Sequence, residues 1–225
     1  EPPAIRRPAP APQPGPAPVP PPPPPPIVQE ELPEHAPFVE AYNKLGQPKL
    51  AVIVYRSNDP ADPFRAGNDV PPPRNDGVGP LNDRAVDYRA LELSLQDWLA
   101  AQGRVSIRSS SQLPAEPKPE EIAAIRNGDR NGAQQVGQRL EVDVLVVVWA
   151  EVSRHTEGGL TIRLASEAIF LSDRAPRRNV RGDSIGRASV DMPPRMQLDT
   201  IHVTTRAIAR KLLLDMTQTW NAWTR

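Results

Sequence analysis

The sequence predicts a small α/β domain, with a mixed sheet of about four strands flanked by helices, preceded by a disordered proline-rich segment. Two continuous runs rich in β-branched residues, Leu50 to Tyr55 and Val142 to Val152, are typical of strands that are buried on both faces. Two other segments, Arg84 to Gln102 and Leu198 to Trp223, repeat apolar residues every three or four positions, as helices do. About half of the residues before Pro33 are proline, which excludes both helix and sheet from that part of the chain.

The proline-rich segment, residues 1–34, is expected to be a disordered tether. In polyproline II conformation the chain rises about 3.1 Å per residue, so some thirty residues reach on the order of 100 Å. The unbroken run Pro20 to Pro26 is its stiffest part. A docking peptide for an SH3- or WW-like groove is the alternative, but a spacer requires only composition. Because the sequence begins at Glu1 and not at methionine, we expect a processed signal peptide or an artificial boundary upstream.

Residues 35–225 are expected to form one domain, because 225 residues accommodate one core plus appendages. Apolar residues at helical spacing from Phe38 to Leu45, followed by Gly46, predict a short opening helix. The first strand, Leu50 to Tyr55, comes next. Residues 56–83 hold prolines, glycines, Asn and Asp but almost no apolar residues, and they predict a long flexible loop.

A helix from Arg84 to Gln102 follows this loop, with Asp83 or Asn82 as its N-cap and Gly103 after its last residue. The apolar residues Val105 and Ile107 then predict a brief second strand from Arg104 to Arg108.

The centre of the sheet is expected in the second half of the domain. Two helices, from Glu120 to Ile125 and from Asp129 to Leu140, lead into the strongest strand, Val142 to Val152. The turn at Glu157 to Gly159 tolerates positive φ, and the alternation from Leu160 to Phe170 predicts a half-exposed antiparallel strand.

The end of the chain is predicted to close the domain. Ser172 to Ala188 is predicted as a basic loop or hairpin, with a short apolar piece around Val190. The long final helix, Leu198 to Trp223, is expected to cover the sheet. The four tryptophans are expected in or near the core: Trp98, Trp149, Trp220 and Trp223.

No signature of catalysis or of a cofactor is present, so we expect no enzyme activity, no cofactor and no metal site. His35, His155 and His202 have no ligand partner three or four residues away, and solvated or capping roles are expected for them. The chain has no cysteine and no G-x-S-x-G, and Ser109 to Ser111 resemble a loop at a strand end. No glycine-rich phosphate loop follows a strand.

Charge and hydropathy narrow the class of partner. The formal net charge is zero, which gives no global attraction to nucleic acid or to an anionic membrane. No run of about 18 apolar residues exists, so no transmembrane segment is expected. Aromatic residues are too few to form a stacking platform for bases. A protein partner is therefore expected.

Charged residues supply the candidate site. The acidic residues of the domain are expected to form an exposed row. Its members are Glu92, Asp97, Glu141, Asp143, Glu151 and Glu167. Alternatively, Glu151 and Glu167 could pair across the hairpin. Arginines are concentrated between Ser172 and Ala188, where they could bind an acidic partner, a phosphate or an anionic glycan, or could form a merely solvated loop. The candidate partner-binding residues are Arg174, Arg177, Arg178, Arg181 and Arg187.

Three segments carry a resemblance to a known family: the strand Leu50 to Tyr55, the helix Tyr88 to Leu99 ending at Gly103, and the stretch Ala133 to Val148. In the last, a helix ending in Gln-Arg-Leu runs into the strand sequence Val-Asp-Val-Leu at 142–145. From about Lys49 to Arg225 the chain resembles the curli-secretion lipoprotein and penicillin-binding-protein activator (CsgG/LpoB-type) superfamily, which is related to the amino-terminal domain of TolB.

The resemblance implies a location and a role. In the activator branch, a proline-rich segment crosses the peptidoglycan from a lipid-anchored amino terminus. It therefore implies a periplasmic or outer-membrane-associated protein of the Gram-negative envelope, with a lipid anchor upstream. The chain departs from the family in having no lipobox cysteine, in its long loop, and in lacking a pair of amphipathic strands that could line a pore.

Together these features predict a non-enzymatic protein-interaction domain on a tether, an activator or accessory factor of a cell-wall or secretion assembly. A cell-wall synthase or a secretion component is the expected partner. One alternative is an oligomeric structural component of an outer-membrane secretion apparatus. The other is a small-ligand-binding or enzymatic domain that uses residues 56–83 as a lid, which a pocket of convergent polar groups would favour.

Overall fold

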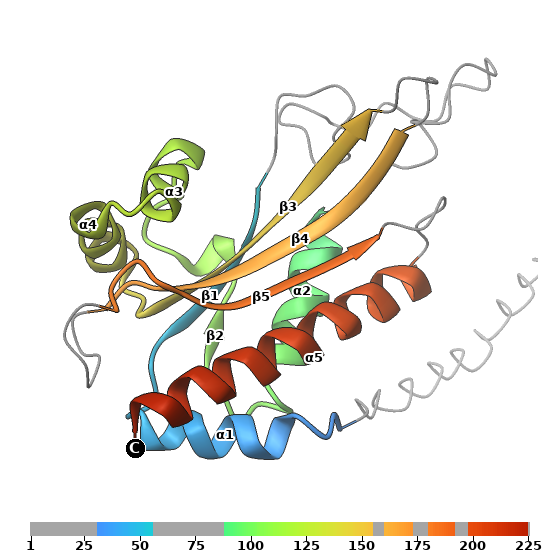
Figure 1. Cartoon of the computed structure of the whole chain (residues 1–225). Coiled ribbons are helices and arrows are strands. Elements are labelled where there is room, and N and C mark those ends of the chain that lie inside the picture. Colours follow the sequence, from blue (N-terminus) through green and yellow to red (C-terminus); the bar gives the residue numbers. More distant parts are fainter. Residues whose placement is uncertain (1–30, 56–87, 155–159, 173–179, 192–197, 225) are drawn as a thin grey trace, which may run out of the picture. The chain divides into compact units, whose positions relative to one another are not determined.

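A mixed β-sheet forms the middle layer of the domain (Figure 1). The computed structural model describes residues 31–55, 88–154, 160–172, 180–191 and 198–224, and within these the sheet has five strands in the order β2-β1-β3-β4-β5. β1 is parallel to β2 and β3, whereas β4 is antiparallel to β3 and β5. The strands are β1 (Leu50–Val54), β2 (Ile107–Arg108), β3 (Val144–Arg154), β4 (Leu160–Phe170) and β5 (Ser184–Asp191). The predicted α/β class with a mixed sheet is confirmed.

Helices cover both faces of the sheet (Figure 1). On one face lie α1 (His35–Lys44), α2 (Tyr88–Leu99) and α5 (Leu198–Trp223). On the other lie α3 (Pro119–Arg126) and α4 (Arg130–Leu140). This double cover explains why the predicted central strands are continuous apolar runs, since β1 and residues 144–148 of β3 are buried on both faces.

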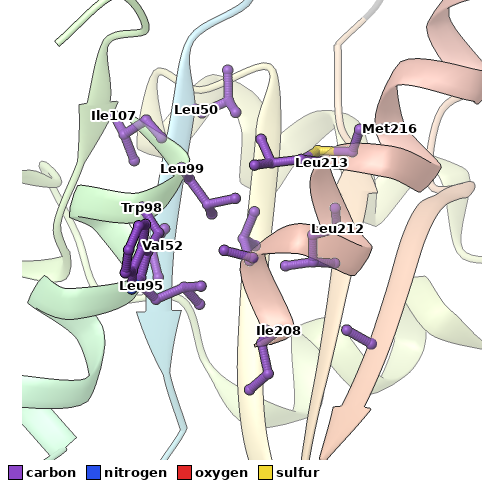
Figure 2. Packing of buried hydrophobic residues seen from close by; sticks show 14 of the residues in the cluster. Leu50, Val52, Leu95, Trp98, Leu99, Ile107, Ile208, Leu212, Leu213 and Met216 are labelled. Carbon is purple, nitrogen blue, oxygen red and sulfur yellow. The ribbon is translucent and has the colours of Figure 1, made fainter. Parts of the chain in front are cut away.

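The larger core lies between the sheet and the helices α1, α2 and α5. Figure 2 shows side chains of α2 and α5 converging with those of β1 in this layer. Trp98 and Trp220 are almost fully buried there, and the Trp220 ring stacks on that of Phe38 with centroids 5.2 Å apart. Burying a large apolar side chain contributes about 1.5–3 kcal/mol, so this layer is the main source of stability.

The smaller core lies under α3 and α4. Ile122 and Ile125 of α3 and Val136 of α4 pack against Ile53 and Val147 of the sheet. Gly137 lets α4 approach closely, because a Cβ at that position would lie 2.9 Å from the Leu171 Cβ. The spacing of apolar residues in the sequence predicted both of these helices.

The amino-terminal edge of the domain begins before the predicted boundary. Leu32 is buried in the larger core, and Glu34 forms an ion pair with Arg210 of α5. His35 is also buried: its Nδ1 accepts a hydrogen bond from the Leu32 N–H, so its Nε2–H donates to the Trp98 carbonyl at 2.9 Å. Burial lowers the pKa of His35. For His35 the predicted capping role is therefore borne out, whereas the solvated role is not. Residues 1–30 of the predicted tether lie outside the described residues.

Two predicted boundaries need correction. α2 ends at Leu99 and not at Gln102, because Ala101, Gln102 and Gly103 have φ of 48°, 61° and 81°, which no α-helix contains. The segment to Ala188, predicted as a loop or hairpin, contains most of β5, which pairs with β4 along its length and so agrees with the hairpin alternative. The predicted loop at 56–83 and the turn at 157–159 lie outside the described residues.

Candidate functional site

The structure describes two of the five candidate arginines, Arg181 and Arg187, and places them in separate contacts. Arg181 follows the 173–179 gap, and its guanidinium donates to Gln134 Oε1 of α4 at 2.7 Å. Arg187 lies on β5, and its Nε–H donates to Glu167 Oε1 at 2.9 Å; its Nη2 forms an ion pair with the same oxygen at 2.8 Å. The other three lie outside the described residues: Arg174, Arg177 and Arg178.

Glu167 is the centre of the contact that Arg187 makes. Its side chain is only 3% exposed, and Arg126, the last residue of α3, places Nε 2.8 Å from Oε2 as an ion pair. The Arg126 guanidinium also lies over the Trp149 ring, 4.3 Å from its centroid. Two cations from distant parts of the chain therefore meet at one buried carboxylate, and we call these residues the Glu167 network: Arg126, Trp149, Glu167 and Arg187.

The prediction that Glu167 is an exposed member of a half-exposed strand is wrong. Glu167 shares its strand face with Ile169, which is buried beneath α3 and α4, so both faces of this part of β4 are covered. Apolar residues at 169 and 171, on the face assigned to solvent, were the signal that could have shown this. Nor does Glu167 pair with Glu151, because the register sets Glu151 opposite Arg163 and Glu167 opposite Val147.

The network presents positive charge outward. Two guanidinium charges and one carboxylate charge leave one net positive charge, and the carboxylate is the inner member. Arg126 and Arg187 are 43% and 72% exposed, so their charged ends reach solvent while Glu167 fixes their positions. A guanidinium has five N–H donors, and both keep some for a further acceptor.

A groove of about 500 Å³ runs beside the network. Ser189 of β5 lines it, as do all four network residues. Lys211 of α5 adds a third cation and Glu151 of β3 an exposed carboxylate. Lys211 is paired with Asp215 one turn later on the same helix. The groove therefore offers arginine donors of fixed orientation beside an aromatic ring, which suits a carboxylate or phosphate group.

A second cavity, of about 270 Å³, opens where the parallel strands β1 and β2 end. Among its lining residues are Tyr55, Tyr88, Glu92 and the serines of the short 3-10 helix η2 (Ser110–Gln112). Glu92 is 5% exposed, and its Oε1 accepts hydrogen bonds from the Ser110 N–H at 2.8 Å and hydroxyl at 2.9 Å. This is the kind of polar pocket that the ligand-binding alternative requires, although its predicted lid lies outside the described residues.

Glu92 is thus a second acidic residue whose predicted exposure is wrong, because α2 turns it towards η2. The predicted exposure of the acidic row is confirmed for Asp97, Glu141 and Glu151. Asp143 is half-buried, and its Oδ2 accepts from the Lys49 N–H at 2.8 Å, which ties the start of β3 to that of β1.

Within the described ranges, no group of three or more His, Asp or Glu side chains could hold a metal ion. Nor is any helix there both long and apolar enough to cross a membrane. His202 is exposed and lies against Trp98, with ring centroids 4.6 Å apart, and His155 lies in the 155–159 gap. The predicted core or near-core positions of the tryptophans are confirmed, since Trp149 and Trp223 are half-buried and the other two are fully buried.

The segments from which the resemblance was inferred form β1, α2, and α4 running into β3. In the sheet, β3 pairs with the parallel strand β1 on one side and with the antiparallel strand β4 on the other. No protein-family model matches the sequence, and no curated protein matches it either.

Proposed function

We propose that this chain is a non-enzymatic protein-interaction domain of the cell envelope, held on a proline-rich tether, and an activator or accessory factor of a cell-wall or secretion assembly. The observation that carries the proposal is the Glu167 network. A buried carboxylate fixes two exposed arginines beside a groove, in the manner of a docking site for an acidic group of a partner protein.

The network suits docking because its arginines are already ordered. A free arginine loses side-chain entropy when it binds, whereas Arg126 and Arg187 are held in advance by Glu167 and, for Arg126, by Trp149. Each charge-assisted hydrogen bond to a partner carboxylate is worth about 1.5–3 kcal/mol. Arginine and tryptophan are also the residues most enriched among those that dominate binding energy.

The tether and the family resemblance support the envelope setting. In polyproline II conformation about thirty residues would reach on the order of 100 Å, and a tethered domain would meet its partner at a raised effective concentration. A lipid anchor upstream, a periplasmic or outer-membrane-associated location, and a cell-wall synthase or secretion component as partner all belong to this proposal.

The test is quantitative co-purification from envelope extract with the tagged full chain. The groove variant combines Arg126→Gln, Glu167→Gln and Arg187→Gln, which removes the arginines together with the buried charge and so preserves the fold. The control is Arg163→Gln, which removes an arginine that is 49% exposed and pairs with Asp191 at 2.8 Å on the neighbouring strand.

We expect wild type and the control to retain the same partner, and the groove variant to retain it about tenfold less, because a loss of 1.4 kcal/mol lowers affinity tenfold. Circular dichroism of each protein checks that it is folded. Equal capture by all three folded proteins would remove the groove as the docking site.

A further inference from the structure

The cavity at the ends of β1 and β2 holds a buried charge that the proposed docking function does not use. It is about 270 Å³ in volume and is bounded by the end of β1, the first turns of α2 and the serines of η2. The carboxyl ends of parallel strands are where open α/β sheets bind their ligands. The position and the buried carboxylate of Glu92 are two independent reasons to look for a ligand here.

Within the described ranges, hydrogen bonds reach only one of the two carboxylate oxygens of Glu92. Both hydrogen bonds from Ser110 go to Oε1, and the structure gives Oε2 no hydrogen bond from any described residue. No lysine, arginine or histidine of the described chain forms an ion pair with Glu92, although the residue is only 5% exposed and lines the cavity. Among the described residues, the carboxylate therefore has hydrogen bonds on one oxygen and no counter-ion.

A structural role for Glu92 accounts for only part of this arrangement. Its Oε1 caps the first N–H of η2, for which an uncharged acceptor would suffice. Burying a carboxylate without a cation is costly, so a residue that served only as a cap would gain from being neutral. The described part of the fold supplies no cation that accounts for this negative charge.

The surroundings of Glu92 favour a cation. Because the faces of aromatic rings attract cations, the Arg89 guanidinium lies over the Tyr88 ring, 5.8 Å from its centroid; Tyr88 and Tyr55 both line the cavity. Glu116 also lines it, so two carboxylates outnumber the one guanidinium of Arg89, which donates from Nε to the Tyr88 hydroxyl at 2.9 Å. The lining residues that the structure describes therefore carry a net charge of −1.

We infer that this cavity binds an ammonium or guanidinium group, with Glu92 Oε2 as its counter-ion. The volume is just below the roughly 300 Å³ at which pockets for drug-sized molecules begin, so the group is the size of a single side chain. It can come from a lysine or arginine of a partner protein or from a free small amine. The inference does not rest on the acidic-group docking proposed for the Glu167 network.

The experiment is a titration of the ¹⁵N-labelled full chain followed by NMR, with the Ser110 amide as reporter because it donates to Glu92. The probes are propylguanidinium and butylammonium, with propylurea and butanol as neutral isosteres. Blocked tripeptides with a central lysine or arginine form the second arm. The variants are Glu92→Gln, which keeps the hydrogen bonds from Ser110, and Leu93→Lys, which puts a competing cation on a lining residue that is 54% exposed.

We expect a saturable shift of the Ser110 amide with the cations and none with the isosteres. Loss of a charge-assisted contact in Glu92→Gln should weaken binding about 10- to 100-fold, and Leu93→Lys should weaken it by competition. Tripeptides that bind more tightly than the free cations identify a protein source, and the reverse order identifies a small amine. Absence of a saturable shift with all cations, or equal binding by Glu92→Gln, would overturn the inference.

Discussion

The buried carboxylate of Glu167 gives a stability prediction in which one change, Glu167→Gln, has opposite effects on two backgrounds. Glu167 is 3% exposed and cannot turn into water, whereas Arg126 and Arg187 are 43% and 72% exposed and can. Replacing both arginines by alanine leaves an unpaired buried charge, which costs about 3–5 kcal/mol. Glu167→Gln with both arginines present costs only about 1–2 kcal/mol, because the freed guanidiniums become solvated.

Glu167→Gln on the arginine-free background should therefore be stabilising. It removes the unpaired charge and is expected to recover about 1–2 kcal/mol of the loss. The assay is urea unfolding at pH 7 of four proteins: wild type, the single variant, the double arginine variant and the triple variant. If Glu167→Gln destabilised both backgrounds to the same extent, Glu167 would contribute packing and not a paired charge, and the reasoning would be refuted.

Three further changes test other contacts. Hydrogen bonds from Arg139 lower the pKa of Glu121 to about 2, so its stabilisation is present above pH 4.5 and is lost as the pH falls towards 2. Glu121→Gln should cost about 1 kcal/mol at pH 7, discounted for the partial exposure of both groups, and should flatten that acid limb in urea titrations. Burial lowers the pKa of His35, so the unfolded chain binds more protons and stability should fall as the pH drops below 6.5; His35→Gln should remove this slope. Gly137→Ala should lower the free energy of unfolding by about 1–3 kcal/mol, although alanine has the higher helix propensity. The reason is that the new Cβ would lie 2.9 Å from the Leu171 Cβ. The loss is measured as a lower midpoint of thermal unfolding.

Each of these changes has a matched control elsewhere on the domain. For Glu121→Gln the control is Glu120→Gln, at an exposed neighbour on the same helix. For His35→Gln it is His202→Gln, at an exposed histidine, and for Gly137→Ala it is Asn131→Ala, at an exposed position of α4. An acid limb that persists in Glu121→Gln, or a pH slope that His202→Gln removes instead of His35→Gln, contradicts the assigned pairs. Unchanged stability of Gly137→Ala would show that α4 can move away from the sheet at little cost.

Local patterns predicted most of the fold. The run of apolar residues from Leu198 to Trp223 gave the bounds of α5 as the structure has them, because a helix this long repeats its period several times. β5 could not be predicted in the same way. Its residues, Ser184–Asp191, are largely polar, and they form a strand because β4 supplies the hydrogen-bonding partner.

The site was harder to predict because it depends on pairs that are distant in sequence. Arg126 and Arg187 lie 41 and 20 residues from Glu167, on opposite sides of it in the chain. A glutamate between apolar residues has the pattern of a solvent-facing position, and only the position of α3 over β4 reverses that assignment. Glu92 was misassigned for the same reason, since its partner Ser110 belongs to another element.

The central claim is that the groove beside the Glu167 network contacts a partner protein, and photo-crosslinking in cells tests it most directly. A benzoylphenylalanine in place of Ser189, an exposed residue of β5 that lines the groove, reports what lies there. The same group in place of Gln138, exposed on α4, is the control position. We predict one distinct crosslinked protein from position 189 that is lost when Arg126 and Arg187 are replaced together with Glu167. A crosslink that is equally strong without the arginines, or none at position 189, would contradict the claim.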